Sequence, residues 1–192
     1  MAINATHFQD IPPVPKKKTR HVVHAIIETA KNSPHKYALA GKYGIIQLKE
    51  VLPDDMHWPY DYGFVPGTLA DDGDPLDLLV ITQNGLFSGC FLKVRVVGAI
   101  REYKNGVRND RLIGVPLPSD GAPQAYDAYK DIDDVPKPLL KEIKDFVKTY
   151  SQRQGNEVKL GGIVGAKAAM RSVEKTSRAF HRDRRHKKKA AR

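Results

Sequence analysis

The chain has 192 residues, of which 41% are hydrophobic, and a formal net charge of +10. This length suits one domain with a substantial core, and no apolar run approaches the roughly 18 residues that a membrane-spanning helix needs. The single cysteine, Cys90, excludes a disulfide framework. Together with the lack of a signal-peptide pattern, it predicts a cytoplasmic protein with no membrane span.

The positive charge is concentrated at the two ends of the chain. From Arg171 onward there are ten Lys or Arg and two acidic residues, so this segment carries +8 of the net charge. A second basic cluster at 16–20 follows three prolines. The composition therefore predicts a basic, proline-rich arm at 1–20, a nearly neutral domain at 21–181 and a basic tail at 182–192.

Short apolar runs broken by Gly, Pro and Asp predict β-strands through the first half of the domain. The predicted strands are 21–28, 44–51, 76–82 and 90–102. Short strands at such close spacing favour a small barrel.

Two helices are predicted in the last third of the chain. Asp134-Val135-Pro136 combines an acidic cap with an early proline. Apolar residues then recur at helical spacing, which predicts a stripe that packs on the core; they are Leu139, Leu140, Ile143, Phe146, Val147 and Tyr150. A second helix is predicted at 165–181, ahead of the basic tail.

The segment Asp72-Gly73-Asp74-Pro75-Leu76-Asp77 places three carboxylates directly before the apolar run 78–81. Carboxylates this close repel one another, and a hard cation among their oxygens relieves the repulsion. Mg²⁺ prefers one or two carboxylates together with waters and phosphate oxygens. The alternative is a plain acidic turn ahead of a buried strand.

The string DGDPLD before a hydrophobic strand resembles the signature of the soluble family I inorganic pyrophosphatases. Other elements that resemble the family lie at fitting distances and extend the match over about residues 20–180; they are Glu28, Lys36-Tyr37, 58–63, 112–116, 131–136 and a helix that ends near Tyr150. The resemblance implies a mainly β fold with α-helices (α+β), a small twisted five-stranded OB-like barrel flanked by two helices. It also implies a homo-oligomer, with a hexamer favoured over a dimer.

The resemblance further implies Mg²⁺-dependent hydrolysis of pyrophosphate to two phosphates, with Mn²⁺ as an alternative metal. Asp74 would be the general base for the attacking water. The implied metal ligands are Asp72 and Asp77, with Glu28 acting through water and Asn109 through its amide oxygen. The implied phosphate contacts are Lys36, Tyr62, Arg111, Tyr150 and Lys104. For the two tyrosines, ordinary core packing is the alternative.

The chain departs from the family pattern at several positions of this implied site. The six main departures are Ala38 for Glu, Glu50 for Arg, Trp58 for Tyr, Lys104 and Asn109 for two Asp, and Ser151 for Lys. Arg111 stands where the family has Lys and keeps the charge. The changes at the acidic positions remove about three negative charges and add one positive charge, so additional metal sites should be weakened.

These departures suggest compensations and leave three functions open. The Lys104 ammonium takes the place of a missing metal in one hypothesis, and Lys49 partly replaces the missing Arg. A one-residue slip that brings Asp110 into the site is disfavoured by strand alternation. The functions are a pyrophosphatase, slow and with fewer metals; a degenerate homologue, inactive or acting on another phosphate compound; and a non-enzymatic protein that binds nucleic acid or another polyanion through its basic arms. For the tail, a solvated, disordered end is the alternative.

Overall fold

The computed structural model describes residues 8–16, 19–118 and 126–190. Lys17 and Lys18 of the predicted basic arm and residues 191–192 of the predicted tail lie outside the described residues. The strands are β1 (Val22–Thr29), β2 (His35–Ala40), β3 (Ile45–Val51), β4 (Asp61–Val65), β5 (Leu76–Val80), β6 (Phe91–Lys104), β7 (Val107–Arg108), β8 (Arg111–Leu117) and β9 (Val158–Gly165). The helices are η1 (Phe8–Asp10), η2 (Ile132–Asp134), α1 (Lys137–Arg153) and α2 (Ala166–Ala190).

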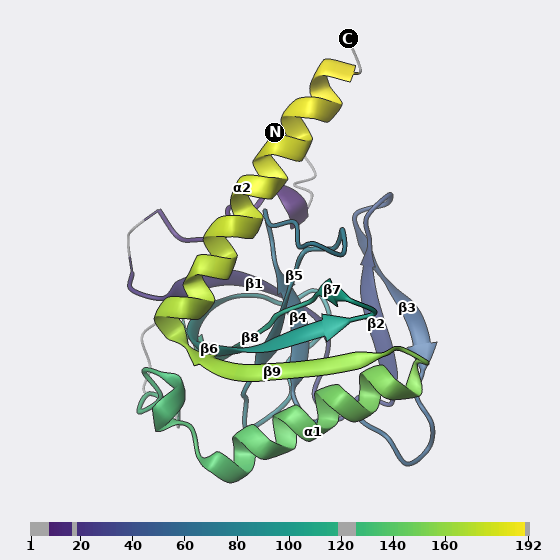
Figure 1. The fold of residues 1–192 in the computed structure, drawn as a ribbon, viewed down its shortest axis with the longest axis vertical. Helices are drawn as coiled ribbons and strands as arrows, with labels where there is room; N and C mark the ends of the chain where they lie inside the picture. Colours follow the sequence, from purple (N-terminus) through teal and green to yellow (C-terminus); the bar gives the residue numbers. More distant parts are fainter. Residues whose placement is uncertain (1–7, 17–18, 119–125, 191–192) are drawn as a thin grey trace.

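Five strands close into a barrel, which confirms the predicted fold class. They pair in the order β1-β4-β5-β8-β6, and β6 pairs back to β1 (Figure 1). The β5–β8 pairing is parallel, whereas the other four pairings of the barrel are antiparallel. β9 adds to β6, while β2 and β3 form a separate hairpin beside the barrel.

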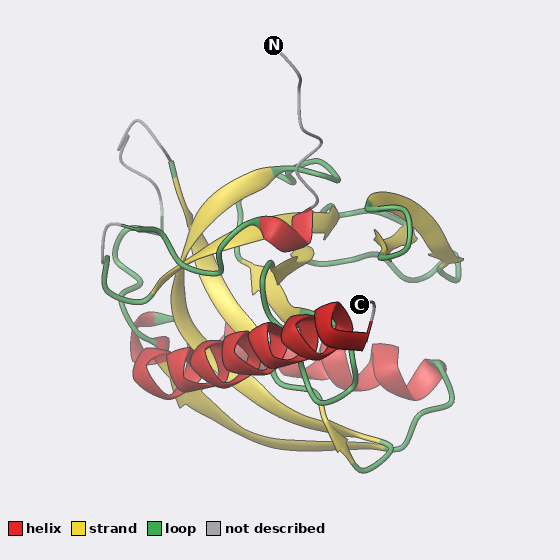
Figure 2. Cartoon of the chain, turned by 90° about the horizontal axis from the view of Figure 1, so that it is seen from above, coloured by secondary structure: helices red, strands yellow, loops and turns green. Residues whose placement is uncertain are grey.

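The two long helices lie against the barrel (Figures 1 and 2). Successive side chains of a strand point to opposite faces, so β5 supplies apolar residues to two clusters. Leu78 belongs to the cluster that contains Val173 of α2, and Leu79 to the cluster that contains Val147 of α1. This explains why the run after the acidic segment is continuously apolar rather than alternating.

The ends of the helices differ from the prediction. The acidic cap belongs to η2, where the Asp131 carboxylate accepts a hydrogen bond from the backbone N–H of Ile132, and α1 begins only at Lys137. α2 continues to Ala190 instead of ending near residue 181. No helix of the described residues is long and apolar enough to cross a membrane.

Candidate active site

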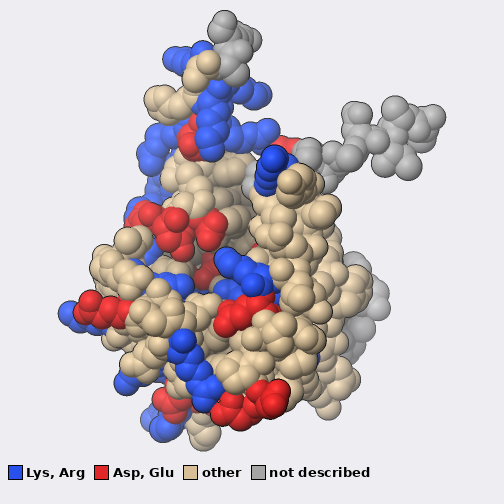
Figure 3. All heavy atoms as spheres, turned by 90° about the vertical axis from the view of Figure 1, so that its right-hand side faces the viewer, with Lys and Arg blue, Asp and Glu red and all other residues tan. Residues whose placement is uncertain are grey.

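One cleft of about 280 Å³ brings together all ten residues predicted to form the site. They come from the strands of the barrel, β2 of the separate hairpin, the loops before β5 and β8, and α1: Glu28, Lys36, Tyr62, Asp72, Asp74, Asp77, Lys104, Asn109, Arg111 and Tyr150. Lys49 of β3 also lines the cleft. On the face that carries the β2–β3 hairpin, basic and acidic side chains lie next to one another (Figure 3). The cleft is therefore polar and of mixed charge.

The acidic loop before β5 is held by its own backbone. Gly73 adopts a φ of +92°, which favours glycine, and the Asp74 N–H donates to a carboxylate oxygen of Asp72 over 3.1 Å. Burial and the neighbouring carboxylates of Asp77 and Asp74 raise the pKa of Asp72 above its ordinary value. This is the electrostatic crowding that a bound cation would relieve.

The Arg111 guanidinium occupies the floor of the cleft and is the centre of a buried network. Its Nη1 lies 3.2 Å from Asp77 Oδ2 and 3.0 Å from the Tyr62 hydroxyl, and its Nε lies 2.5 Å from Glu102 Oε2. Burial alone would lower the pKa of Arg111, but Tyr62, Asp77 and Glu102 outweigh it and raise the pKa. Arg111 is thus a permanent cation in contact with Asp77.

Glu102 is a site residue that the sequence prediction missed. Its side chain is fully buried, and its second oxygen, Oε1, accepts a hydrogen bond from Ser151 over 2.9 Å. A signal was present, because residues two apart on a strand share a face. If Lys104 of β6 points into the site, Glu102 points there as well. Ser151, one of the departures from the family pattern, therefore completes the network that holds Arg111.

The amine of Lys36 lies over three aromatic rings. It is 5.0 Å from the ring centre of Tyr150 and 5.9 Å from those of Trp58 and Tyr62. Such cation–π contacts hold an ammonium group in place. Desolvation lowers the pKa of Lys36 to about 8, although Asp77 opposes the shift. Trp58 thus keeps an aromatic role where the family has Tyr.

A second network orders the far end of the cleft. The Tyr150 hydroxyl donates to Glu50 Oε2 over 3.0 Å, and the Gln154 amide donates to the same oxygen over 2.9 Å. Lys104 Nζ lies 3.5 Å from Gln154 Oε1. Glu50, which stands where the family has Arg, is therefore an anchor for Tyr150, and Lys104 belongs to this network.

Glu28 is almost buried and is bound to the β2–β3 hairpin. Its Oε1 accepts a hydrogen bond from the backbone N–H of Leu39 over 2.6 Å. Desolvation raises its pKa to about 7, and Asp77 adds to the shift. β1 and β4 also approach closely beside it, since a Cβ on Gly63 would stand 2.0 Å from the carbonyl oxygen of Ile26. This close approach fixes Tyr62 next to β1.

Asp110 lies outside the cleft, as strand alternation predicts. Its carboxylate accepts from Arg108 over 2.7 Å and from Ser172 of α2 over 3.1 Å, and it also pairs with Arg101. The alternative in which Asp110 slips into the site is therefore wrong, and Asn109 is the residue that lines the cleft.

The donor set fits one hard cation better than several. Among residues 8–16, 19–118 and 126–190, no three or more acidic, histidine or cysteine side chains form a metal-binding group. Mg²⁺ is commonly held by one or two carboxylates, with waters and substrate phosphates completing its shell. Asp72 and Asp77 satisfy that requirement, and the crowding at Asp72 supports it. Further ions would depend on positions now held by Lys104, Asn109 and Ala38.

The family model, the relatives and the solved structure that this chain matches all belong to the same enzyme family. A family model described as inorganic pyrophosphatase matches residues 25–181. The inorganic pyrophosphatase of Geobacillus stearothermophilus is 38% identical over 153 residues, which are 80% of this chain and 90% of the relative. That of Thermus thermophilus is 39% identical over 159 residues, covering 81% and 89%. The crystal structure of the Thermus thermophilus inorganic pyrophosphatase has a TM-score of 0.80 at 34% identity and covers 92% of this chain and 99% of that chain.

Proposed function

The chain belongs to the inorganic pyrophosphatase family, and we propose that it hydrolyses pyrophosphate to two phosphates in the cleft around Asp74. The resemblance found in the sequence is confirmed by these comparisons. The observation that carries the proposal is the convergence of all ten predicted site residues in one cleft, despite the departures from the family pattern.

Asp74 is the residue best placed to take a proton from the attacking water. Its side chain is exposed at the mouth of the acidic loop, while its backbone is held by Asp72. Asp72 and Asp77 would hold Mg²⁺ or Mn²⁺, with Glu28 acting through water and Asn109 through its amide oxygen, and the metal would supply a lowered water pKa and neutralisation of phosphate charge. The Asp74 carboxylate would accept the proton of the attacking water.

Three cationic side chains line the cleft and can contact phosphate oxygens; only Lys104 adds a charge that the family pattern lacks, since Lys36 matches that pattern and Arg111 keeps the charge of its Lys. Arg111 is fixed from below by Glu102, Lys36 is held over aromatic rings, and Lys104 is oriented by Gln154. Fixed donors of this kind stabilise phosphate oxygens without reorganising during the reaction. The hypothesis that the Lys104 ammonium takes the place of a missing metal stays a prediction, because the contact of Lys104 is with Gln154, whereas the cation in contact with Asp77 is Arg111.

A second candidate function is binding of pyrophosphate or a related phosphate compound without hydrolysis. The observation that favours it is the contact between Arg111 and Asp77, which engages an oxygen of an expected metal ligand. Loss of metal from this site would leave an anion-binding cleft lined by cations. The two candidate functions predict different turnover of pyrophosphate, but both predict affinity for phosphate compounds.

The deciding experiment measures phosphate release from pyrophosphate by the purified chain across Mg²⁺ and Mn²⁺ concentrations. We expect Asp74→Asn to lower the rate by about 10²–10⁴-fold, because the general base is removed. Asp71→Asn is the matched control, since Asp71 lies nearby but pairs with Lys175 outside the cleft. Its rate should stay within about twofold of the parent chain.

Two outcomes would overturn hydrolysis at Asp74. One is equal release from the Asp74→Asn and parent proteins, which would place the chemistry elsewhere. The other is no release by the parent protein at any metal concentration. In that case, saturable binding of pyrophosphate in calorimetry would support the second candidate.

Assembly and location are further proposals. A homo-oligomer, with a hexamer favoured, is supported by large apolar side chains that are exposed on one chain, such as Ile45 (58%), Val51 (64%) and Phe87 (69%). Sedimentation at the mass of one 21.4 kDa chain would contradict it.

A cytoplasmic location is supported by the single free cysteine, and recovery of the protein outside the cytoplasm on cell fractionation would contradict it.

A further inference from the structure

The last part of α2 extends beyond the barrel and is densely basic (Figures 1 and 3). Phe180 is the last buried residue of the helix. The nine residues that follow, 181–189, contain six Lys or Arg, two His and one Asp. Helical structure is maintained through them to Ala190. Packing on the barrel does not explain this segment, because nothing in it is buried.

Most of these charges are uncompensated. Arg184 pairs with Asp10 over 2.7 Å, and Lys187 pairs with Asp183 over 2.8 Å. Five further cations make no ion pair with any residue in the described parts of the chain: Arg178, Arg182, Arg185, Lys188 and Lys189. A concentration of unpaired cations on one helix creates a positive potential that attracts an anionic partner.

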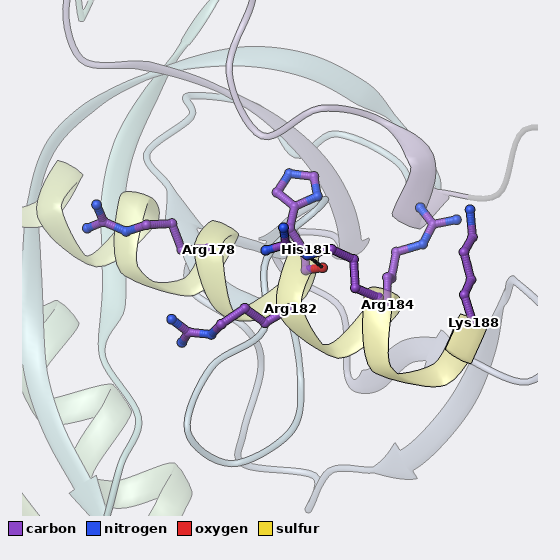
Figure 4. A pocket seen from close by; sticks show the side chains of 6 residues that line it. Arg178, His181, Arg182, Arg184 and Lys188 are labelled. Carbon is purple, nitrogen blue, oxygen red and sulfur yellow. Dashed lines mark hydrogen bonds between the residues drawn. The ribbon is translucent and has the colours of Figure 1, made fainter. Parts of the chain in front are cut away.

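The unpaired cations form an ordered stripe. Arg178, Arg182, Arg185 and Lys189 recur at intervals of four, three and four residues, which places them on one side of the helix. At 1.5 Å per residue the stripe is about 16 Å long. Arg178 and Arg182 extend from one flank of α2, and Arg184 and Lys188 from another (Figure 4). The helix thus presents cations along a straight edge with more on the adjacent flank.

The side chains of residues 178–189 favour one anionic partner over two others: duplex nucleic acid over a membrane or single-stranded nucleic acid. A helix that inserts into a membrane interface buries an apolar face, and residues 181–189 contain no apolar side chain, so only electrostatic attraction would hold them at a membrane. Single-stranded nucleic acid is usually held by stacking bases on exposed aromatic rings. Phe180, the one Phe, Tyr or Trp of residues 178–189, is 9% exposed and is covered by Arg184. A duplex, with about one charge per 1.7 Å of its axis, needs neither feature.

We propose that the basic edge of α2, residues 178–189, binds the phosphate backbone of duplex nucleic acid without reading its sequence. Lys and Arg contacts to phosphates fix position and orientation but carry no sequence information. This inference is independent of catalysis in the cleft, because none of these residues lines it.

The test measures binding of the full chain to a labelled random-sequence duplex by fluorescence anisotropy across salt concentrations. If all five unpaired cations contact phosphates, the slope of log K against log salt should approach about −4.5. A stripe variant then replaces four of them with glutamine: Arg178→Gln, Arg182→Gln, Arg185→Gln and Lys189→Gln. We expect it to lose about tenfold or more in affinity near 0.1 M salt and to flatten the slope by about 3–4.

A control variant changes the net charge equally on another helix. It carries Lys137→Gln, Lys141→Gln, Lys144→Gln and Lys148→Gln on α1, none of which lines the cleft. We expect its duplex affinity to fall by less than about threefold, because distant charges are screened by salt. Circular dichroism and phosphate release establish that both variants are folded.

Four outcomes would overturn the proposal. They are no duplex binding by the parent chain, affinity that does not depend on salt, equal loss in the two variants, and tighter binding to a single strand than to the duplex. Vesicles containing phosphatidylserine form a further arm. Binding to these vesicles without binding to the duplex would assign the basic edge to membranes instead.

Discussion

The cleft and the basic edge of α2 contain the same kinds of charged residue, but they are held in opposite ways. In the cleft, Arg111 is 4% exposed and contacts Glu102 and Asp77. On α2, Arg182 and Lys189 are exposed and make no ion pair within the described parts of the chain. Burying an unpaired charge costs several kcal/mol, whereas an exposed charge costs little. Removing a single charge in the cleft should therefore lower the stability of the fold. The charges on α2 should instead contribute together to the affinity for a partner.

The largest effect is expected from breaking the cleft network at Glu102. Glu102→Ala leaves the Arg111 cation buried without its closest partner and removes the acceptor for Ser151. We expect the free energy of unfolding to fall by about 3–5 kcal/mol, which urea denaturation would measure. Glu157→Ala is the control, because that glutamate is exposed, and it should change stability by less than about 0.5 kcal/mol. A loss below about 1 kcal/mol for Glu102→Ala would contradict this account of the cleft.

A double substitution separates the effect of the buried Glu102–Arg111 pair on stability from its effect on phosphate release. Replacing both members of a buried ion pair with apolar residues is often neutral or stabilising. We expect Glu102→Leu together with Arg111→Leu to recover at least half of the stability that Glu102→Leu alone loses. Phosphate release should nevertheless stay low, because the cation beside Asp77 is gone. Losses that simply add would show that the two residues are not coupled.

An intermediate effect is expected where the barrel meets α2. Asp110 is 5% exposed and binds Arg101, Arg108 and Ser172 through one oxygen, but both arginines reach solvent. We expect Asp110→Asn to cost about 1–3 kcal/mol of unfolding free energy, since hydrogen bonds to a charged group are lost while the arginines rehydrate. Urea denaturation at low and high salt would measure it. A loss of unfolding free energy as large as that of Glu102→Ala would contradict this prediction. It would mean that the partial exposure of Arg101 and Arg108 does not lower the cost of leaving them unpaired.

Part of the fold followed from local patterns, whereas β2, β4, β7, β8 and β9 were not predicted as strands. The apolar periodicity placed α1 within three residues of its start, and the run after Asp77 is the buried strand β5. The predicted end of α2 near residue 181 was wrong, because the helix continues through the basic tail to Ala190. Lys, Arg and Ala are strong helix formers, and the pair of Asp183 with Lys187 adds support one turn apart.

The candidate site was predictable only in part. The acidic loop is continuous in sequence, so its chemistry was visible there. The contact between Glu50 and Tyr150 joins residues 100 positions apart, and no local pattern encodes such a pairing. Glu102 was missed because its role depends on Arg111 across the β6–β8 hairpin. Two departures from the family pattern are thus bound to other residues of the site: Ser151 donates to Glu102, and Glu50 accepts from Tyr150.

The smallest effect on stability is expected from a single charge on α2. Arg182→Gln keeps a helix-forming residue and removes no contact with the barrel, because residue 182 is exposed and lies past the last buried position. We expect the free energy of unfolding to change by less than about 0.5 kcal/mol. In duplex binding, the same substitution should flatten the salt slope by about 0.9, the value of one phosphate contact. A stability loss of more than about 1 kcal/mol would mean that this charge is used inside the fold, and the contrast between the two regions would fail.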